Sequence, residues 1–237
     1  NYRTNIYGQI LTSTADLDVE IKPGYNTPDS EVYPVVVDAA GLQAALDAAL
    51  PGVTTTISLA RDIEGDVVDF QRADRDIVID GRNNKFNGTI RIHNGSIYND
   101  GTITIKNVNF ETSTASINFI EALENGSERY SNNITVENCT FTATGAAMNT
   151  AVAVQVKATR GVTVTGCTAT NMHSLIQAQS CDTGDVKVID CTVNGKNGVA
   201  FKQVKAATVE GTTITALEYG IRFDGNIDNY GIIVKNN

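Results

Sequence analysis

The sequence is poor in large rings, in proline and in long hydrophobic runs. Of its 237 residues none is tryptophan, 6% are aromatic and four are proline. A core built on large rings is therefore excluded, and valine, isoleucine, leucine and alanine must supply it. The scarcity of proline excludes an array of proline-rich linkers. No stretch reaches the roughly 18 consecutive apolar residues of a membrane span, so we expect no transmembrane segment in this chain.

Positive charge is also scarce. The chain has 18 lysines and arginines against 27 acidic residues, which gives a net charge of −9 and a pI of about 4.7. The average field would repel a nucleic acid, so nucleic-acid binding is excluded as a function class. A local basic strip could still bind an anionic polymer. The chain opens at Asn1 within a strand-like pattern and without a signal peptide, so we expect a fragment of a longer protein.

A short strand–turn–strand pattern recurs along the chain. Ile103-Thr-Ile-Lys-Asn107-Val-Asn-Phe110 returns as Ile134-Thr-Val-Glu-Asn138-Cys-Thr-Phe141, and later copies follow at intervals of 28, 24 and 21 residues. Such intervals suit the coils of a β-helix, which must stack to bury their inner faces. The fifth position holds only residue types that tolerate a left-handed backbone: Gly81, Asn107, Asn138, Gly166, Asp190 and Gly211. The pattern predicts an all-β, single-stranded parallel β-helix over residues 35–237, with a sharp corner in every coil.

A short helix is expected before the coils. Asp38 can cap it, Leu42, Leu46 and Leu50 line one face, and Pro51-Gly52 ends it. Such a helix would cover the first coil, whose open edge could otherwise pair with another chain. Residues 1–34 read differently, and we expect there a strand-like tail of an upstream domain or a linker.

A second strand in each coil carries polar residues between apolar ones. Counting from the corners predicts that they align in two outward rows, because alternate residues of a strand face opposite sides. Stacked amide and cationic groups suit the hydroxyls and carboxylates of an extended glycan; a merely soluble sheet face is the alternative. The first row holds Arg91, Asn118, Gln155, Gln177, Lys202 and Arg222, and the second holds His93, Lys157, Gln179 and Asp224.

The cysteines and the acidic residues do not predict a metal site. Cys139, Cys167 and Cys191 occupy one repeat position, next to the corner, so we expect a buried stack that packs as small hydrophobic residues. Cys181 lies outside this stack. Four acidic residues gather in the first coil without the spacing of a dedicated loop, which favours a solvated face and leaves Ca²⁺ as the alternative: Asp62, Glu64, Asp66 and Asp69.

The leading helix Gly41-Leu-Gln-Ala-Ala-Leu46 and the recurrent corner resemble the pectate-lyase-like superfamily of right-handed parallel β-helices over residues 35–237. The resemblance implies the architecture, since many functions share this scaffold. The opening Asn1-Tyr-Arg-Thr-Asn-Ile-Tyr-Gly8 and Val19-Glu-Ile21 resemble the tail of fimbrillin-like domains of Bacteroidetes surface proteins. That similarity implies an extracytoplasmic protein at the cell surface, either a lipoprotein or one associated with fimbriae.

The catalytic signatures of enzymes in that superfamily are missing. His93 in Arg-Ile-His-Asn-Gly and His173 in Asn-Met-His-Ser match no polygalacturonase motif, and no paired aspartates lie on an expected strand. We therefore expect no catalytic or metal-binding residues, and a non-enzymatic adhesion module that contacts polysaccharides or host or microbial surface glycans. The alternatives are a polysaccharide lyase or glycoside hydrolase acting on uronic-acid polymers, and a structural stalk. The oligomeric state stays open.

Overall fold

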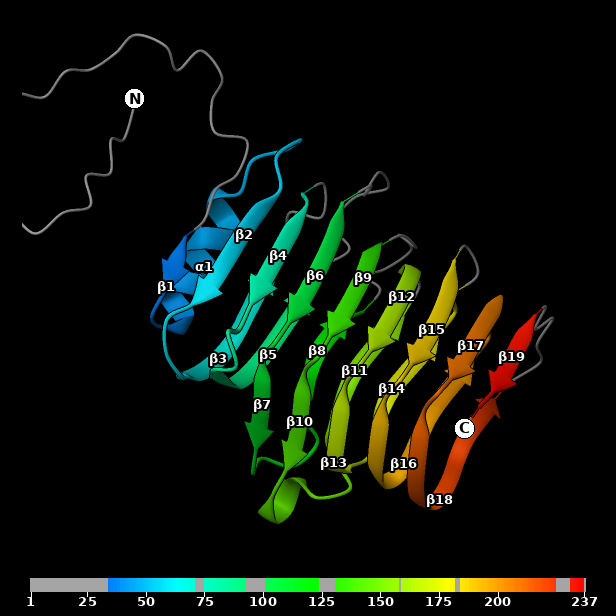
Figure 1. Cartoon of the computed structure of the whole chain (residues 1–237). Coiled ribbons are helices and arrows are strands. Elements are labelled where there is room, and N and C mark those ends of the chain that lie inside the picture. Colours follow the sequence, from blue (N-terminus) through cyan, green and yellow to red (C-terminus); the bar gives the residue numbers. More distant parts are fainter. Residues whose placement is uncertain are drawn as a thin grey trace, which may run out of the picture.

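The computed structural model describes residues 34–70, 75–92, 101–123, 131–157, 159–181, 184–224 and 231–236. The chain winds into a right-handed parallel β-helix of about seven coils, which stack in sequence order from one end to the other (Figure 1). Each described strand pairs with strands of the neighbouring coils in parallel. The predicted fold class is confirmed.

One sheet contains the strand that precedes the corner of each coil. The repeat places its isoleucines and valines inward, and the register aligns Ile103 with Ile134 and Val162 with Val186. We call it sheet A. Its described strands run in the order β1 (Val35–Val36), β2 (Thr55–Leu59), β4 (Ile77–Asp80), β6 (Thr102–Lys106), β9 (Ser131–Glu137), β12 (Thr159–Thr165), β15 (Asp185–Ile189), β17 (Ala206–Glu210) and β19 (Ile232–Lys235).

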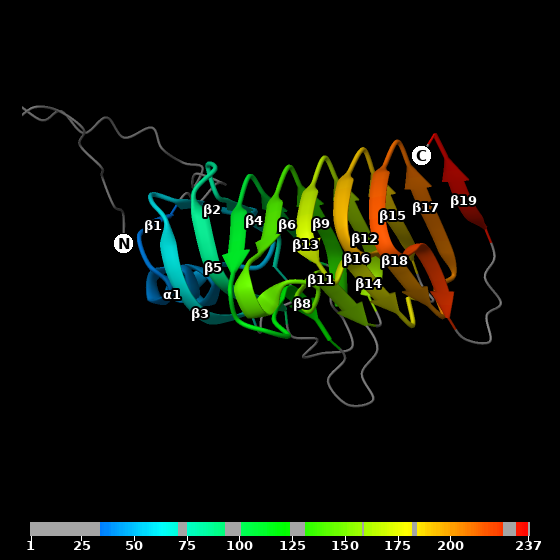
Figure 2. The same ribbon diagram turned by 90° about the horizontal axis from the view of Figure 1, so that it is seen from below.

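The remaining strands form the other two sides of each coil (Figure 2). Directly after the corner come β7 (Asn109–Thr112), β10 (Thr140–Ala143) and β13 (Thr168–Met172). The next side begins with β3 (Ile63–Phe70) and β5 (Lys85–Ile92) and continues with β8 (Asn118–Ala122), β11 (Val152–Lys157) and β14 (Ser174–Gln179). The long strands β16 (Thr192–Lys202) and β18 (Thr213–Asp224) pass through both sides. So do β3 and β5, because the start of β5 pairs with β7 and its end pairs with β8. We call the outer surface of β8, β11, β14 and the C-terminal halves of β16 and β18 the groove face.

The corners adopt the left-handed conformation that the sequence predicts. The φ angle is 54° at Asn107, 52° at Asn138, 61° at Gly166, 52° at Asp190 and 58° at Gly211. At two of these positions a side chain of the coil beneath occupies the space that a Cβ would take. A Cβ on Gly166 would lie 2.4 Å from Asn138 Oδ1, and one on Gly211 would lie 2.2 Å from Asp190 Oδ1.

The first corner differs from the prediction. The left-handed conformation falls on Arg82 and Asn83, with φ of 50° and 63°, and not on Gly81. Glycine is needed at position 81 for space, because a Cβ there would lie 2.4 Å from the Asn107 carbonyl oxygen. The turn before Phe86 is two residues longer than in the later coils, and the bend therefore falls on the two residues after Gly81.

Aromatic and thiol side chains fill the interior beside the corners. Phe110 and Phe141 stack with ring centroids 5.0 Å apart, and Phe119 packs against both. The predicted cysteine stack is confirmed, since each of its three members is at most 2% exposed: Cys139, Cys167 and Cys191.

Helix α1 (Ala39–Ala48) packs against β1 and β3 at the N-terminal end of the coils (Figure 1). Asp38 caps it by accepting a hydrogen bond from the Gly41 N–H at 2.7 Å, and Leu42 and Leu46 are buried. Leu50 was expected on the same face, but the helix ends two residues earlier and Leu50 is 57% exposed. Among the described residues, no helix is long and apolar enough to cross a membrane.

Candidate functional site

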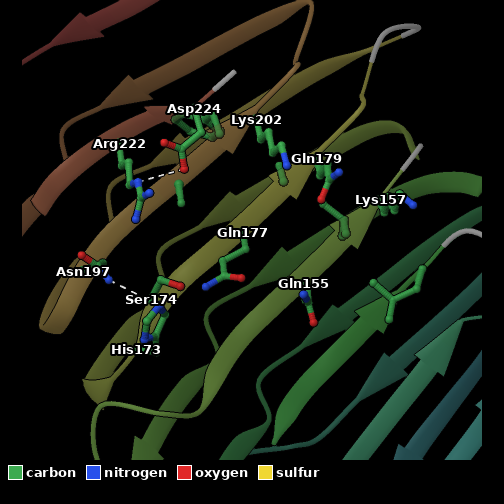
Figure 3. A pocket seen from close by; sticks show the side chains of 15 residues that line it. Gln155, Lys157, His173, Ser174, Gln177, Gln179, Asn197, Lys202, Arg222 and Asp224 are labelled. Carbon is green, nitrogen blue, oxygen red and sulfur yellow. Dashed lines mark hydrogen bonds and ion pairs between the residues drawn. The ribbon is translucent and has the colours of Figure 1, made fainter. Parts of the chain in front are cut away.

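A groove of about 230 Å³ lies on the groove face, over β11, β14, β16 and β18 (Figure 3). Polar side chains from several coils line it, together with apolar ones. Because the coils stack in register, residues far apart in sequence come together there. The described lining residues are Leu123, Gln155, Val156, Lys157, His173, Ser174, Gln177, Ala178, Gln179, Asn197, Ala200, Phe201, Lys202, Arg222 and Asp224.

Two rows of outward side chains run across the strands of the groove. Gln155 aligns with Gln177, Gln177 with Ala200, and Ala200 with Arg222; we call these four residues the inner row. Two residues further along each strand, Lys157, Gln179, Lys202 and Asp224 align in the same way and form the outer row. Successive members of a row are separated by the strand spacing of roughly 4.8 Å.

Ala200 makes the inner row discontinuous. Its neighbours Gln177 and Arg222 have long side chains, whereas Ala200 ends at a methyl group. The gap has an apolar floor between two polar walls. Within the described part of the chain, the amides of Gln177 and Gln179 make no hydrogen bond, so they keep their donors and acceptors for a ligand.

The register corrects two placements made from the sequence. Asn118 was expected in the first row, but Arg91 aligns with Glu121, and Glu121 aligns with Gln155. Asn118 lies three residues earlier, opposite Val152. The irregular segment between β7 and β8 has a length that counting from the corner did not capture.

Lys202 was expected beside Gln177 and Arg222, but it belongs to the outer row, opposite Gln179. Arg91 lies on β5, away from the groove, where its Nε contacts Glu121 Oε2 at 3.0 Å. His93, which was expected in the second row, lies outside the described residues. The other predicted row members, Gln155, Lys157, Gln177, Gln179, Arg222 and Asp224, do line the groove.

A third group of polar residues closes one end of the groove, and the sequence gave no prediction for it. His173, Ser174 and Asn197 lie together there, at the end opposite the outer row (Figure 3). We call these three residues the polar niche. A signal existed, because Ser174 and Asn197 each precede an inner-row residue by three positions, as Asn118 precedes Glu121.

The hydrogen bonds of the polar niche are incomplete. His173 Nδ1 lies 3.2 Å from the Asn149 carbonyl oxygen, and its Nε2 lies 3.4 Å from Asn197 Nδ2. Ser174 is fully buried and Asn197 is 4% exposed. Ser174 Oγ and Asn197 Oδ1 nevertheless find no hydrogen-bond partner among the described residues. Buried polar atoms in that state are rare in proteins.

The groove is more basic than the chain as a whole. Among the described residues that line the groove, three carry a positive charge and one carries a negative charge. The cations are Lys157, Lys202 and Arg222, and the carboxylate is Asp224. Arg222 Nε contacts Asp224 Oδ2 at 2.8 Å, and its guanidinium lies 5.3 Å from the centre of the Tyr219 ring. Lys202 is exposed and has no ion-pair partner within the described ranges. It can therefore meet a negatively charged or hydroxyl-bearing ligand.

Two of the acidic residues of the first coil, Asp62 and Glu64, have structural partners. Asp62 Oδ1 accepts a hydrogen bond from the Lys85 N–H at 2.8 Å, and Glu64 Oε2 accepts one from Asn87 Nδ2 at 2.9 Å. These contacts join one coil to the next. A search of the described residues found no group of three or more histidine, cysteine, aspartate or glutamate side chains that could hold a metal ion.

The cysteine stack does not supply a nucleophile at neutral pH. A hydrogen bond with the Cys139 side chain, together with burial, raises the pKa of Cys167 to about 12. The same causes, with Cys167 as the neighbour, raise the pKa of Cys191. The reactive form of cysteine is the thiolate, so thiols in this state are inert.

Comparisons with known proteins agree with this architecture. Residues 35–150 match a family described as "Putative pectate lyase-like adhesive domain". Among solved structures, the chain is similar to a two-site variant of pectate lyase from Xanthomonas campestris, with a TM-score of 0.61 and 14% sequence identity, covering 86% of this chain and 68% of that one. A comparison with curated protein sequences found no match. The chain thus has the pectate-lyase-like β-helix fold, and the part that includes its first coils is similar to adhesive domains built on that fold.

Proposed function

We propose that this protein is a non-enzymatic adhesion module that binds extended glycans in the groove over β11, β14, β16 and β18. The observation that carries the proposal is the gap at Ala200, with an apolar floor between the polar side chains of Gln177 and Arg222. A sugar ring has the matching surfaces, because its C–H face is apolar and its edge carries hydroxyls. The similarity of residues 35–150 to an adhesive domain supports the same function.

The two rows supply the polar contacts that such a ligand needs. The Gln177 and Gln179 amides can each donate and accept hydrogen bonds with hydroxyl groups. Lys202 can bind a carboxylate or a sulfate as well as a hydroxyl. Since the rows cross several coils, one extended glycan can contact more than one strand, and several weak contacts add up.

An adhesive function places the domain outside the cell or on its surface. We propose in addition that residues 1–34 are the tail of an upstream fimbrillin-like domain or a linker, and that the protein is attached to the cell as a lipoprotein or through fimbriae. The motif at Asn1–Gly8 supports this proposal.

The experiment uses a glycan array with the wild-type chain and two matched variants. Ala200→Gln fills the gap with a side chain like that of Gln177. It should weaken binding at least about tenfold, because the sugar ring can no longer pack against the methyl group of Ala200. Thr163→Gln puts the same side chain on the outer surface of sheet A, opposite Lys187, and should leave binding unchanged. Binding of no glycan by the wild type, or equal binding by Ala200→Gln, would overturn the proposal.

A polysaccharide lyase is the second candidate, and the likeness to a pectate lyase favours it. In the groove of this chain, the carboxylate of Asp224 forms an ion pair with Arg222. A lyase would need a base, and Lys202 or Arg222 could supply it. Incubation with polygalacturonate, with and without Ca²⁺, distinguishes the two functions. Unsaturated product ends that disappear in Lys202→Ala or in Arg222→Ala would establish the lyase, whereas an adhesion module leaves the polymer intact.

A further inference from the structure

We propose that the groove selects glycans in which acidic sugars alternate with neutral sugars. The inference rests on the proposed function, because it names the class of glycan that the groove binds. It starts from the distribution of charge over the four strands under the groove, β11, β14, β16 and β18. In the outer row, Gln179 separates the two lysines Lys157 and Lys202 (Figure 3).

The first three of these strands carry a charge, no charge and again a charge. Lys157 is the charged lining residue of β11, and Lys202 is that of β16. Between them, β14 turns the amides of Gln177 and Gln179 toward the groove, and its described lining residues include no charged group. The side chain of Lys157 is half-buried and that of Lys202 is exposed, so both can reach a ligand.

The fourth strand, β18, carries two charges that cancel. Its outward residues in the groove are Arg222 and Asp224, and they form an ion pair at 2.8 Å. A carboxylate placed over β18 would have to compete with Asp224 for the guanidinium. From β11 to β18, the strands are therefore positive, neutral, positive and neutral.

This alternation has the spacing of sugars in an extended glycan. Lys157 and Lys202 are two strands apart, which corresponds to roughly 10 Å. One sugar of an extended chain advances by about the width of one strand, roughly 5 Å. A glycan that crosses the strands thus places about one sugar on each strand, and the two lysines meet every second sugar.

The amides of β14 discriminate against a carboxylate on the sugar between the lysines. Whichever edge of that sugar carried the carboxylate, its nearest side chains would be Gln177 and Gln179, which have no charge to offset the loss of water. A hydroxyl in the same place can use both the donor and the acceptor of an amide. A polymer with a carboxylate on every sugar is therefore mismatched at β14 and β18, whereas an alternating glycan is matched at all four strands.

The test compares three tetrasaccharides by titration calorimetry at low ionic strength. A hyaluronan tetrasaccharide has carboxylates on alternate sugars, tetragalacturonate has one on every sugar, and cellotetraose has none. We expect the wild-type chain to bind the hyaluronan tetrasaccharide at least about fivefold more tightly than either of the others, because two charge-assisted contacts form without an unmatched carboxylate. A non-specific attraction to a basic surface would instead favour tetragalacturonate, which carries twice the charge.

A swap of two aligned residues changes the pattern of charge without changing its amount. The double variant Gln179→Lys with Lys202→Gln places both cations on neighbouring strands, so it should abolish the preference for the hyaluronan tetrasaccharide over tetragalacturonate. Thr163→Lys with Lys187→Thr is the matched control. It exchanges two aligned residues on the outer surface of sheet A and should leave all three affinities unchanged.

The outcomes separate the inference from the proposed function. If the wild type binds tetragalacturonate or cellotetraose as tightly as the hyaluronan tetrasaccharide, or if the swap in the groove leaves the preference intact, the inference is overturned while the glycan-binding groove stands. If neither these oligosaccharides nor any glycan of the array binds, the proposed function itself fails.

Discussion

Replacing Gly166 by alanine tests the stacking of the corners. The residue has φ of 61°, and an alanine Cβ would lie 2.4 Å from Asn138 Oδ1 of the preceding coil. A left-handed conformation costs a residue with a Cβ roughly 1–2 kcal/mol. The clash adds to that, because the Asn138 side chain must move to make room for the Cβ. We expect the free energy of unfolding to fall by about 2–4 kcal/mol in total.

Gly52 provides the matched control. Its φ is 73°, and a Cβ there would meet nothing within 4 Å. Gly52→Ala therefore carries the backbone penalty alone, about 1–2 kcal/mol. Urea denaturation followed by circular dichroism gives both values. If Gly166→Ala destabilises the protein no more than Gly52→Ala, the corners do not stack as described.

A double-mutant cycle isolates the contact between the two coils. Asn138 has φ of 52°, so glycine is tolerated at that position without backbone strain. In the Asn138→Gly background the oxygen is gone, and Gly166→Ala should cost only the backbone penalty. The expected coupling between the two substitutions is about 1–2 kcal/mol. Additive effects would refute the reasoning.

Three further predictions concern the core and one carboxylate. Phe141→Ala should lower the free energy of unfolding by about 3–5 kcal/mol, because the ring is fully buried and stacked on Phe110, whereas Phe223→Ala, with a ring 38% exposed, should cost clearly less; urea denaturation measures both. The Cys167 thiol should resist a thiol reagent at pH 8 and react only on unfolding, and rapid labelling of the native protein would contradict its raised pKa. Burial raises the pKa of Asp80, but this effect is outweighed by hydrogen bonds from the Arg82 backbone and the Asn107 side chain and by the nearby charge of Lys106. The net result is a pKa below the ordinary value of 3.8. The stability that Asp80 contributes is thus present above pH 3.8 and lost as the pH falls through the lowered pKa, so the stabilities of wild type and Asp80→Asn should converge in acid; a constant difference down to pH 2 would contradict this.

The coil and its corner could be predicted because they repeat. A left-handed residue is needed at one place in every coil, and only a few residue types satisfy it, so Asn107, Asn138 and Gly166 were informative without any structure. The cysteine stack followed from the same periodicity. The first corner was misplaced because two extra turn residues moved the bend to Arg82 and Asn83.

The groove was only partly predictable, because its register depends on segments that do not repeat. Gln177 lies 11 residues after its corner at Gly166, whereas Glu121 lies 14 residues after Asn107. Counting at a fixed distance therefore selected Asn118 in place of Glu121. The gap at Ala200 was missed for a different reason, since a small residue becomes a floor only when its neighbours in adjacent coils are known to be long.

The polar niche could not be derived from local sequence. His173 and Ser174 are adjacent in the chain, but Asn197 joins them from the next coil. That the two oxygens lack partners is a property of the packed structure.

The most direct test of the account is a crystal structure of the chain with a glycan selected on the array. We predict that a sugar ring lies over the Ala200 methyl, between Gln177 and Arg222. A glycan bound instead on the outer surface of sheet A, or on the side formed by β7, β10 and β13, would contradict the assignment of the groove.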